Sequence, residues 1–264
     1  MAAVEPAVRA DRCAGVTRLT LNRPDRHNAL VPDLIEGLRD AVRGLDETPA
    51  SVVILAGAGR SFSTGGDVAG FLAEAERSDR DVAGYARALV GALNDTILAL
   101  LRLDVLVIAR VQGAVTGGSA GLVLAADMVA MADDAFLQPW YAEVGFGPDG
   151  GWTALLPDRV GTGRAVAAQA LNRRIGAAEA VRLGIATEAV APDGLDAAVD
   201  AWAAEVAARS GPSLRAAKRG IWDEERIATV GRRLEAERAR FVELIGRPET
   251  IAGMRRFVAR TKRG

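Results

Sequence analysis

The pattern of apolar and polar positions changes along the chain, from strand-like runs in the first half to helical periods in the second. Residues 5–11 and 15–21 alternate well enough to predict a β-hairpin that turns at 12–15. Continuous apolar runs at 51–55 and 105–111 predict two further strands.

Helical periods follow these strands. Residues 32–45 carry apolar side chains on one face of a predicted helix, and a second helix is predicted over 82–101. From about residue 195 to 260 the pattern is helical throughout, and Pro212 and Pro248 suit the first turn of two of these helices.

Three short strands complete the prediction, at 128–131, at 136–138 and near 188–190. Strands with interleaved helices, followed by helices alone, indicate an α/β fold with a helical end. We therefore expect an α/β core over residues 1–194 and a helical C-terminal region over 195–264.

Composition narrows the function classes. The chain has 264 residues and a formal net charge of −1, which argues against nucleic acid or an anionic membrane as a partner. Its start lacks the pattern of a signal peptide, and no apolar run approaches the roughly 20 residues that cross a bilayer. Cys13 is the only cysteine, which fits a reducing cytoplasm. One histidine and one cysteine make a metal site unexpected.

Two glycine-rich segments, 56–67 and 111–122, carry most of the chemical information. Each follows an apolar strand, and the second leads into a helix-like stretch. Free main-chain N–H groups beside a helix start attract negative charge. Two such sites in one domain can share one developing oxyanion, so acyl-group chemistry is the leading hypothesis.

Two other motif matches are weaker. Residues 117–121 have the Gly-x-Ser-x-Gly spacing of a nucleophile elbow around Ser119, but the only histidine, His27, precedes the serine in the chain. Residues 145–150 have the spacing of a dinucleotide-binding loop, but Pro148 interrupts them and no strong strand comes before.

Several stretches together resemble the crotonase superfamily, the enoyl-CoA hydratase/isomerase proteins, in order and approximate spacing. The matching stretches are 21–30 (LNRPDRHNAL), 61–67 (SFSTGGD), 111–118 (VQGAVTGG), 126–127 (AD) and 148–151 (PDGG). The combination is specific, although each piece alone is not.

The resemblance implies a crotonase (ClpP-like) spiral of ββα units with a helical C-terminal trimerisation region, and thus a homotrimer or a hexamer built as a dimer of trimers. It implies an acyl-CoA substrate, with coenzyme A entering as part of the substrate and no separate cofactor. It places the oxyanion donors at the main-chain N–H groups of Gly66 and Gly118.

The same resemblance suggests further substrate contacts. These are Arg26 and Ala29 near the nucleotide end, Asp67, Val68 and Ala69 along the pantetheine and adenine path, Thr64 and Gly117 in the glycine segments, and Trp140 and Tyr141 beside the acyl group. Phe146 and Trp152 are further candidates for the acyl wall, although aromatic residues are equally typical of a core. We expect Asp67 and Asp127 to cap or brace the backbone rather than to react.

The sequence departs from the hydratases of this family, which use two glutamates to activate water. The first would stand at Gly121, and the second at Trp140 or Tyr141, depending on the alignment. Glu143 is the nearest carboxylate that a shift could bring in. Without two placed carboxylates, water addition lacks its general acid and base.

Asp149 stands where the family's isomerases keep a single acid/base residue. A carboxylate in an apolar pocket can move a proton between carbons if burial raises its pKa. Pro-Asp-Gly is also a turn sequence, so a structural role is an equal alternative. The leading hypothesis is enoyl-CoA double-bond isomerisation. The alternatives are a hydratase that uses Glu143, and a paralogue that binds acyl-CoA without catalysis.

Overall fold

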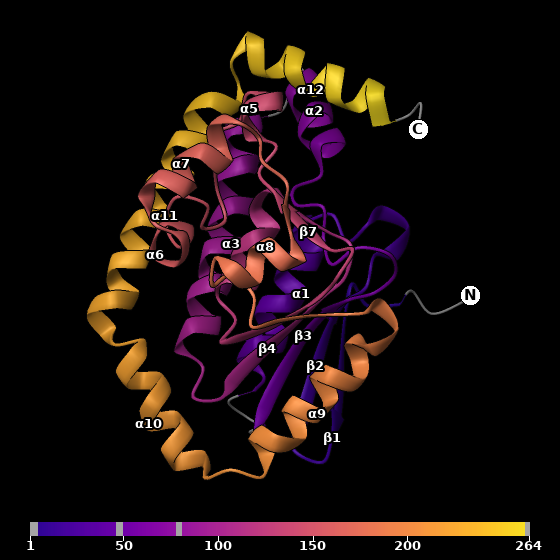
Figure 1. Ribbon diagram of the computed structural model, residues 1–264. Helices are drawn as coiled ribbons and strands as arrows, with labels where there is room; N and C mark the ends of the chain where they lie inside the picture. Colours follow the sequence, from indigo (N-terminus) through magenta and orange to yellow (C-terminus); the bar gives the residue numbers. More distant parts are fainter. Residues whose placement is uncertain (1–4, 46–49, 78–80, 262–264) are drawn as a thin grey trace.

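A computed structural model describes residues 5–45, 50–77 and 81–261 (Figure 1). It begins with the predicted hairpin, in which β1 (Val8–Cys13) pairs antiparallel with β2 (Val16–Leu21). Ala14 and Gly15 form the turn with φ values of 48° and 81°. The turn therefore occupies only the second half of the predicted 12–15 segment.

The main sheet is parallel beyond this hairpin. Its order is β1-β2-β3-β4-β6-β9, with β3 at Val52–Gly57, β4 at Leu106–Val111, β6 at Met128–Ala132 and β9 at Glu188–Val190. All the pairs from β2 to β9 are parallel. The bounds of β2, β3, β4, β6 and β9 lie within two residues of the predicted ones, whereas β1 begins three residues later than predicted.

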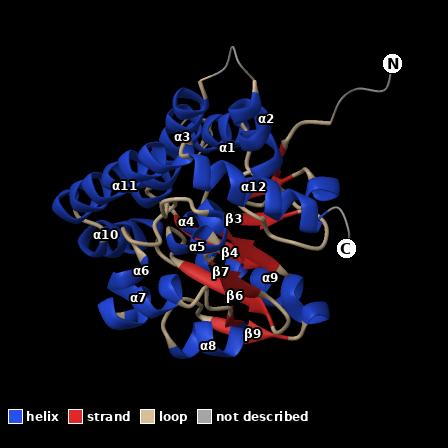
Figure 2. Ribbon diagram, turned by 90° about the horizontal axis from the view of Figure 1, so that it is seen from above, coloured by secondary structure: helices blue, strands red, loops and turns tan. Residues whose placement is uncertain are grey.

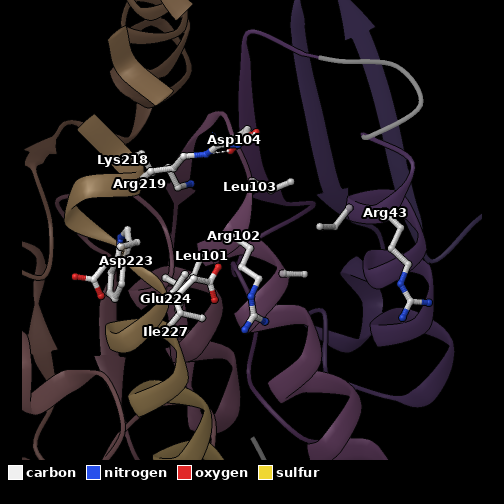
Figure 3. A pocket seen from close by; sticks show the side chains of 13 residues that line it. Arg43, Leu101, Arg102, Leu103, Asp104, Lys218, Arg219, Asp223, Glu224 and Ile227 are labelled. Carbon is white, nitrogen blue, oxygen red and sulfur yellow. Dashed lines mark hydrogen bonds and ion pairs between the residues drawn. The ribbon is translucent and has the colours of Figure 1, made fainter. Parts of the chain in front are cut away.

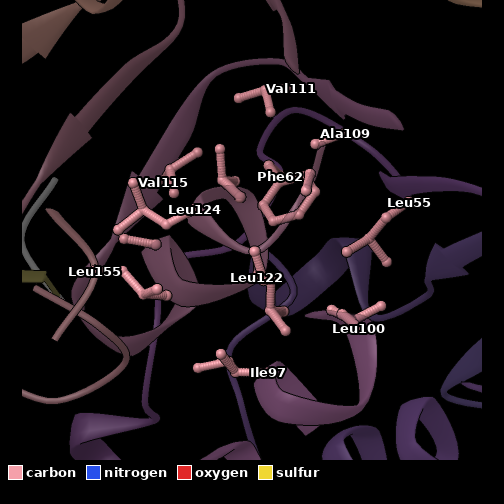
Figure 4. Close-up of a cluster of buried hydrophobic side chains, with 14 of the residues drawn as sticks. Leu55, Phe62, Ile97, Leu100, Ala109, Val111, Val115, Leu122, Leu124 and Leu155 are labelled. Atoms are coloured by element: carbon pink, nitrogen blue, oxygen red, sulfur yellow. The ribbon is translucent and has the colours of Figure 1, made fainter. Parts of the chain in front are cut away.

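Helices cover both faces of the main sheet, as alternation along the strands requires. On one face, Leu55 and Ala109 belong to the buried cluster that also contains Ile97 and Leu100 of α3 (Val82–Arg102) (Figure 4). On the opposite face, Arg110 pairs with Asp196 of α9. The first face is covered by α1 (Pro32–Arg43) and α3. The opposite face is covered by α9 (Leu195–Ala207).

A second, smaller sheet contains β5 (Ala114–Thr116), β7 (Phe136–Gln138) and β8 (Ile175–Gly176) in that order. β5 begins three residues after β4 ends, and β7 begins four residues after β6 ends. Successive strands thus alternate between the two sheets before the chain returns through a helix, which is the repeat of a ββα spiral. The sequence pattern gave no strand at β5, because glycine dominates that segment.

Short helices connect the strands and follow the two glycine segments. They are α2 (Val68–Glu76), α4 (Ala120–Leu124), α5 (Tyr141–Val144), α6 (Leu156–Val160), α7 (Thr162–Ala170) and α8 (Ala177–Arg182). A 3-10 turn, Gly117–Ser119, runs directly into α4. α2 was not predicted, because its apolar residues lack a clear helical period. Residues 78–80, which connect α2 to α3, lie outside the described residues.

The C-terminal helices wrap around the core (Figures 1 and 2). α10 (Gly211–Ile221) and α11 (Glu224–Ile245) form an arc in which α11 packs along α3, and α12 (Pro248–Thr261) crosses α2 and α5. Pro212 and Pro248 lie in the first turns of α10 and α12, as predicted. The expected boundary at 194/195 coincides with the start of α9. Among the described residues, no helix is long and apolar enough to cross a membrane.

Candidate active site

The two glycine segments lie directly against each other. Ser63 and Val115 form a parallel bridge, and the Thr116 N–H donates to the Ser63 carbonyl at 3.1 Å. A Cβ on Gly65 would collide with the Thr116 carbonyl and lie 3.2 Å from the Cα of Gly117. The approach therefore depends on glycine at position 65, where φ is also positive (73°).

Ser119 fastens this junction. Its buried hydroxyl donates to the carbonyls of Ser63 and Thr116, at 3.0 and 2.8 Å. His27, the residue a serine hydrolase would need, contacts Ser61 Oγ instead, at 3.1 Å. The nucleophile-elbow spacing thus serves packing.

Gly66 in the first segment and Gly118 in the second each have a main-chain N–H without an acceptor among the described residues. Gly66 immediately precedes Asp67, the N-cap of α2, and Gly118 is the second residue of the turn that opens α4. Neither N–H donates a hydrogen bond to another described residue. The neighbouring Asp67 N–H, in contrast, donates to the Leu30 carbonyl at 3.3 Å. Unpaired N–H groups at helix starts attract negative charge.

Asp149 lies beside Gly118. A Cβ built on Gly118 would be 2.9 Å from Oδ2 and 3.1 Å from Oδ1 of the Asp149 carboxylate. The next residue, Gly150, has φ 61° and packs so tightly on the Gly118 backbone that a Cβ there would collide with it. The turn that the Pro-Asp-Gly sequence predicts is therefore present, and it also directs the carboxylate at the second glycine segment.

Tyr141 is the hydrogen-bond partner of this carboxylate. Its buried hydroxyl donates to Asp149 Oδ1 at 2.6 Å, and it lies 2.9 Å from the Asp149 carbonyl. Burial and the nearby Asp149 charge raise the pKa of Tyr141 well above its ordinary value, so it stays a donor. The sequence-based hypothesis made Tyr141 a wall of the acyl pocket, and its contact with Asp149 was not foreseen.

The environment of Asp149 suits proton transfer. The residue is 7% exposed, and burial raises the pKa of its carboxyl from 3.8 to about 7. The Tyr141 hydrogen bond lowers this pKa, whereas the buried Glu237 carboxylate raises it. A carboxyl with a pKa near the operating pH can both accept and return a proton efficiently.

Glu237, on α11, is a site residue that sequence reasoning missed. It is 1% exposed and accepts hydrogen bonds from the segment that follows Asp149. Its only sequence signal is a glutamate within an otherwise amphipathic helix, where a solvent-facing position is the usual expectation.

Asn28 is a second missed residue. It is fully buried, with φ 53°, and its amide donates to the carbonyls of Ser61 and Phe62, at 2.9 and 3.0 Å. Its Oδ1 accepts the Arg23 N–H at 2.8 Å. Asn28 thus ties the 21–30 stretch to the first glycine segment. An asparagine just after a proline turn is the one available signal, because asparagine tolerates positive φ.

Trp152 supports the second glycine segment. Its indole Nε1–H donates to the Gly117 carbonyl at 2.8 Å, and the residue is 1% exposed. Phe146, the other candidate for the acyl wall, packs against Phe71 and Phe241 with ring centroids 5.9 and 5.1 Å away. Both side chains thus have contacts within the protein, and whether they also form a wall of the acyl site stays a prediction.

The hydratase positions do not carry a pair of carboxylates. A Cβ on Gly121 would lie 2.5 Å from the Gly150 carbonyl and would collide with Ile97, so a side chain at Gly121 requires the backbone to move. Glu143 is exposed, at the first turn of α5. The other hydratase position falls at Trp140 or Tyr141, and neither is a carboxylate. Trp140 contacts Phe257 edge to face at 5.8 Å.

The remaining predicted substrate residues surround the first glycine segment. Arg26 is exposed, 3.9 Å from Asp67 Oδ2, and the Thr64 N–H donates to the His27 carbonyl at 3.1 Å. Ala29 is buried, and its carbonyl accepts a hydrogen bond from a side chain of the same turn. Whether they contact a substrate stays a prediction, as it does for Val68, Gly117 and Trp140.

The expected roles of the two aspartates are confirmed. Asp67 Oδ1 caps α2 by accepting the N–H groups of Ala69 and Gly70, at 3.1 and 3.2 Å. Asp127 accepts the Val107 N–H at 2.8 Å and pairs with Lys218 at 2.7 Å.

A cavity of about 650 Å³ lies elsewhere, between α3, α10 and α11 (Figure 3). Lys218 lines it, but its Nζ already donates to Asp127 and to the carbonyls of Val105 and Leu100. Asp104, also in the lining, accepts from Arg219. The residues that line this cavity include none from either glycine segment. We therefore place the candidate active site at Gly66, Gly118 and Asp149 and not in this cavity.

Comparison with known proteins adds independent support. A sequence profile of the enoyl-CoA hydratase/isomerase family matches residues 11–263. The chain is 34% identical over 226 residues to the probable enoyl-CoA hydratase EchA12 of Mycobacterium tuberculosis. The matched region covers 84% of this chain and 79% of EchA12.

Solved structures of enoyl-CoA hydratases and isomerases share the fold of this chain. An enoyl-CoA hydratase from Mycobacterium avium subsp. paratuberculosis superposes with a TM-score of 0.85 at 28% identity, covering 96% of each chain. A monofunctional enoyl-CoA isomerase from M. smegmatis gives 0.67 at 31% identity, covering 85% of this chain and 99% of that one. With a matching profile over nearly its whole length and the same fold, this chain belongs to the enoyl-CoA hydratase/isomerase family of the crotonase superfamily.

Proposed function

We propose that this protein is an enoyl-CoA isomerase that moves a carbon–carbon double bond of an acyl-CoA thioester, with Asp149 as the only acid/base carboxylate. The observation that carries the proposal is the position of Asp149, which is buried, has a pKa raised to about 7 and lies against Gly118.

The reaction removes a proton from the α carbon and adds a proton to the γ carbon. The ionised Asp149 carboxylate removes a proton from the α carbon of a 3-enoyl thioester, and the electron pair moves into the thioester carbonyl to give a dienolate. The protonated Asp149 then returns the proton to the γ carbon, which leaves the double bond conjugated with the carbonyl. No water is consumed, so a second carboxylate is unnecessary.

Two main-chain donors would stabilise the dienolate oxygen. The N–H groups of Gly66 and Gly118 have no acceptor among the described residues, and their segments are in contact. A single donor of this kind is worth about 2.7–4 kcal/mol in another enzyme, because the donors are fixed before charge develops. The coenzyme A carrier and the contacts of Arg26, Ala29 and Asp67 with it are part of the same proposal.

The steric closure at Gly121 and the exposure of Glu143 favour the isomerase over a hydratase. The family description and the names of similar proteins include both activities. The choice between them therefore depends on these two residues and on Asp149.

The test is to add purified protein to a 3-enoyl-CoA and to follow the absorbance of the conjugated thioester. An isomerase raises the absorbance over many turnovers, and mass spectrometry finds no added water. A hydratase acts on the conjugated 2-enoyl-CoA, so a parallel assay offers that substrate. A fall in its absorbance with a product heavier by one water, and no change of the 3-enoyl-CoA, indicates a hydratase. A shift that stops at one equivalent per active site indicates a binding protein, and either result overturns the proposal.

We also propose that the protein works as a homotrimer or as a hexamer. Val166 and Leu171 of the α7 region and Ile221 of α10 are 61%, 68% and 59% exposed, so large apolar side chains are available for contacts between chains. Light scattering of the purified protein should give three or six chains per particle. A monomer would remove this part of the proposal and leave the chemistry untouched.

A further inference from the structure

We propose that Glu237 of α11 is a positioning residue, which holds the segment after Asp149 so that the Asp149 carboxylate faces Gly118 and places a second buried negative charge beside it. The inference rests on the proposed role of Asp149 as acid/base. It makes the helical C-terminal region part of the active-site support.

Both oxygens of the Glu237 carboxylate accept hydrogen bonds from one short segment. Its Oε1 accepts the Thr153 N–H at 2.6 Å, the Thr153 hydroxyl at 2.8 Å and the Ala154 N–H at 2.9 Å, and its Oε2 accepts the Gly151 N–H at 2.8 Å. All four partners donate. Burial raises the pKa of Glu237 and these hydrogen bonds lower it, and the ionised carboxylate, which only accepts, is the form that fits all four donors.

These bonds control where Asp149 lies. Gly151 is two residues after Asp149. Gly150 lies between them, and any larger residue in its place would collide with the backbone of Gly118. Gly150 and Gly151 have φ values of 61° and 87°, a conformation that the chain adopts freely only at glycine. Two adjacent glycines are flexible by themselves, so an external anchor is needed to hold the carboxylate in one place.

The charge of Glu237 acts on Asp149 as well. Among the described residues, the titratable groups that act on Asp149 are Tyr141 from α5 and Glu237 from α11. Burial is the main cause of the raised pKa of Asp149, the phenol of Tyr141 lowers this pKa and the Glu237 charge raises it. Removing that charge should therefore lower the pKa of Asp149 and keep it ionised at lower pH.

The experiment compares Glu237→Gln with Glu235→Gln. Glu235 lies on the same helix but is exposed and pairs with Arg238 at 2.7 Å, so it is the matched control. For Glu237→Gln we expect kcat to fall about 10- to 100-fold, as for a small misplacement of a catalytic group, with KM nearly unchanged. The pH midpoint of kcat/KM should move down. Glu235→Gln should change neither.

A second readout does not need activity. Titration of the Asp149 carboxyl, followed by difference infrared spectroscopy against Asp149→Asn, should shift to lower pH in Glu237→Gln and stay in place in Glu235→Gln. A purely structural glutamate would change stability and leave this midpoint where it is. An unchanged midpoint together with an unchanged kcat would overturn the proposal. If the unmodified protein isomerises nothing, the proposed function fails, while this titration still tests Glu237.

Glu237→Asp guards against a Glu237→Gln variant that does not fold. It keeps the charge but is one methylene shorter, so kcat should fall while the pH midpoint is conserved. A kcat equal to that of the unmodified protein would show that the length of the side chain is irrelevant, and the positioning role would be wrong.

Discussion

Asp127 and Asp149 both lie close to α4, yet their surroundings differ in kind. Asp127 follows α4, pairs with the buried Lys218 at 2.7 Å and accepts a main-chain N–H. Asp149 contacts no cation among the described residues, and its side-chain donor is the neutral Tyr141 hydroxyl. The first carboxylate is balanced by opposite charge and ties α10 to the sheet. The second is buried without an opposite charge beside it, and burial raises its pKa to about 7.

The contrast shows what separates a structural carboxylate from a reactive one in this fold. Burial alone is common to both, since the Asp127 side chain is only 11% exposed. The difference lies in the partner, because Asp127 has a cation beside it, whereas Asp149 has none among the described residues and burial raises its pKa.

The largest expected effect separates the two aspartates by rate. Asp149→Asn should lower kcat about 10²- to 10⁴-fold, because the amide cannot accept the substrate proton, while acyl-CoA binding by calorimetry stays measurable. Asp127→Asn, in protein that is still folded, should keep kcat within about tenfold. If Asp149→Asn works at the full rate, Asp149 has no part in the chemistry.

The same two variants should separate in the opposite sense by stability. Asp127→Asn leaves the Lys218 ammonium buried beside carbonyls only, which should cost about 3–5 kcal/mol in the free energy of unfolding by urea. Arg219→Gln, which breaks the exposed pair with Asp104, is the control and should cost less than about 1 kcal/mol. Equal losses would mean that burial of the Lys218 pair is unimportant.

A pH-dependent stability difference should follow from the raised pKa of Asp149. The folded protein keeps this proton between about pH 4 and pH 7, where the unfolded chain has released it. Stability from this group is therefore complete below about pH 4 and is lost as the pH rises through about 7, by up to about 4 kcal/mol. Urea unfolding at several pH values should find the unmodified protein losing stability relative to Asp149→Asn over this range. Parallel curves would mean that the pKa is not raised.

The smallest expected effect concerns Tyr141. In Tyr141→Phe the hydrogen bond that lowers the pKa of Asp149 is absent, so the midpoint of kcat/KM should move to higher pH, opposite to Glu237→Gln. At neutral pH the rate should fall by less than about tenfold, because the carboxylate itself remains. A profile with the original midpoint would show that the phenol does not act on Asp149.

Local patterns predicted the parts of the molecule that depend on neighbours in sequence. The hairpin, the start of α1 at Pro32 and the parallel strands follow from alternation, apolar runs and proline placement. α2 and β5 escaped prediction for the same reason, because glycine and evenly spread apolar residues leave no period to detect. Their structure comes from contacts with the rest of the fold.

For the site, the sequence by itself determined the two glycine segments, the family and the candidate Asp149, since these lie in short contiguous motifs. Only the tertiary structure decided that Asp149 faces Gly118, that Tyr141 is its donor and that Glu237 anchors its loop from 86 residues away. The physical reason is that a pKa and a carboxylate's role depend on burial and partners, which side chains distant in sequence supply together.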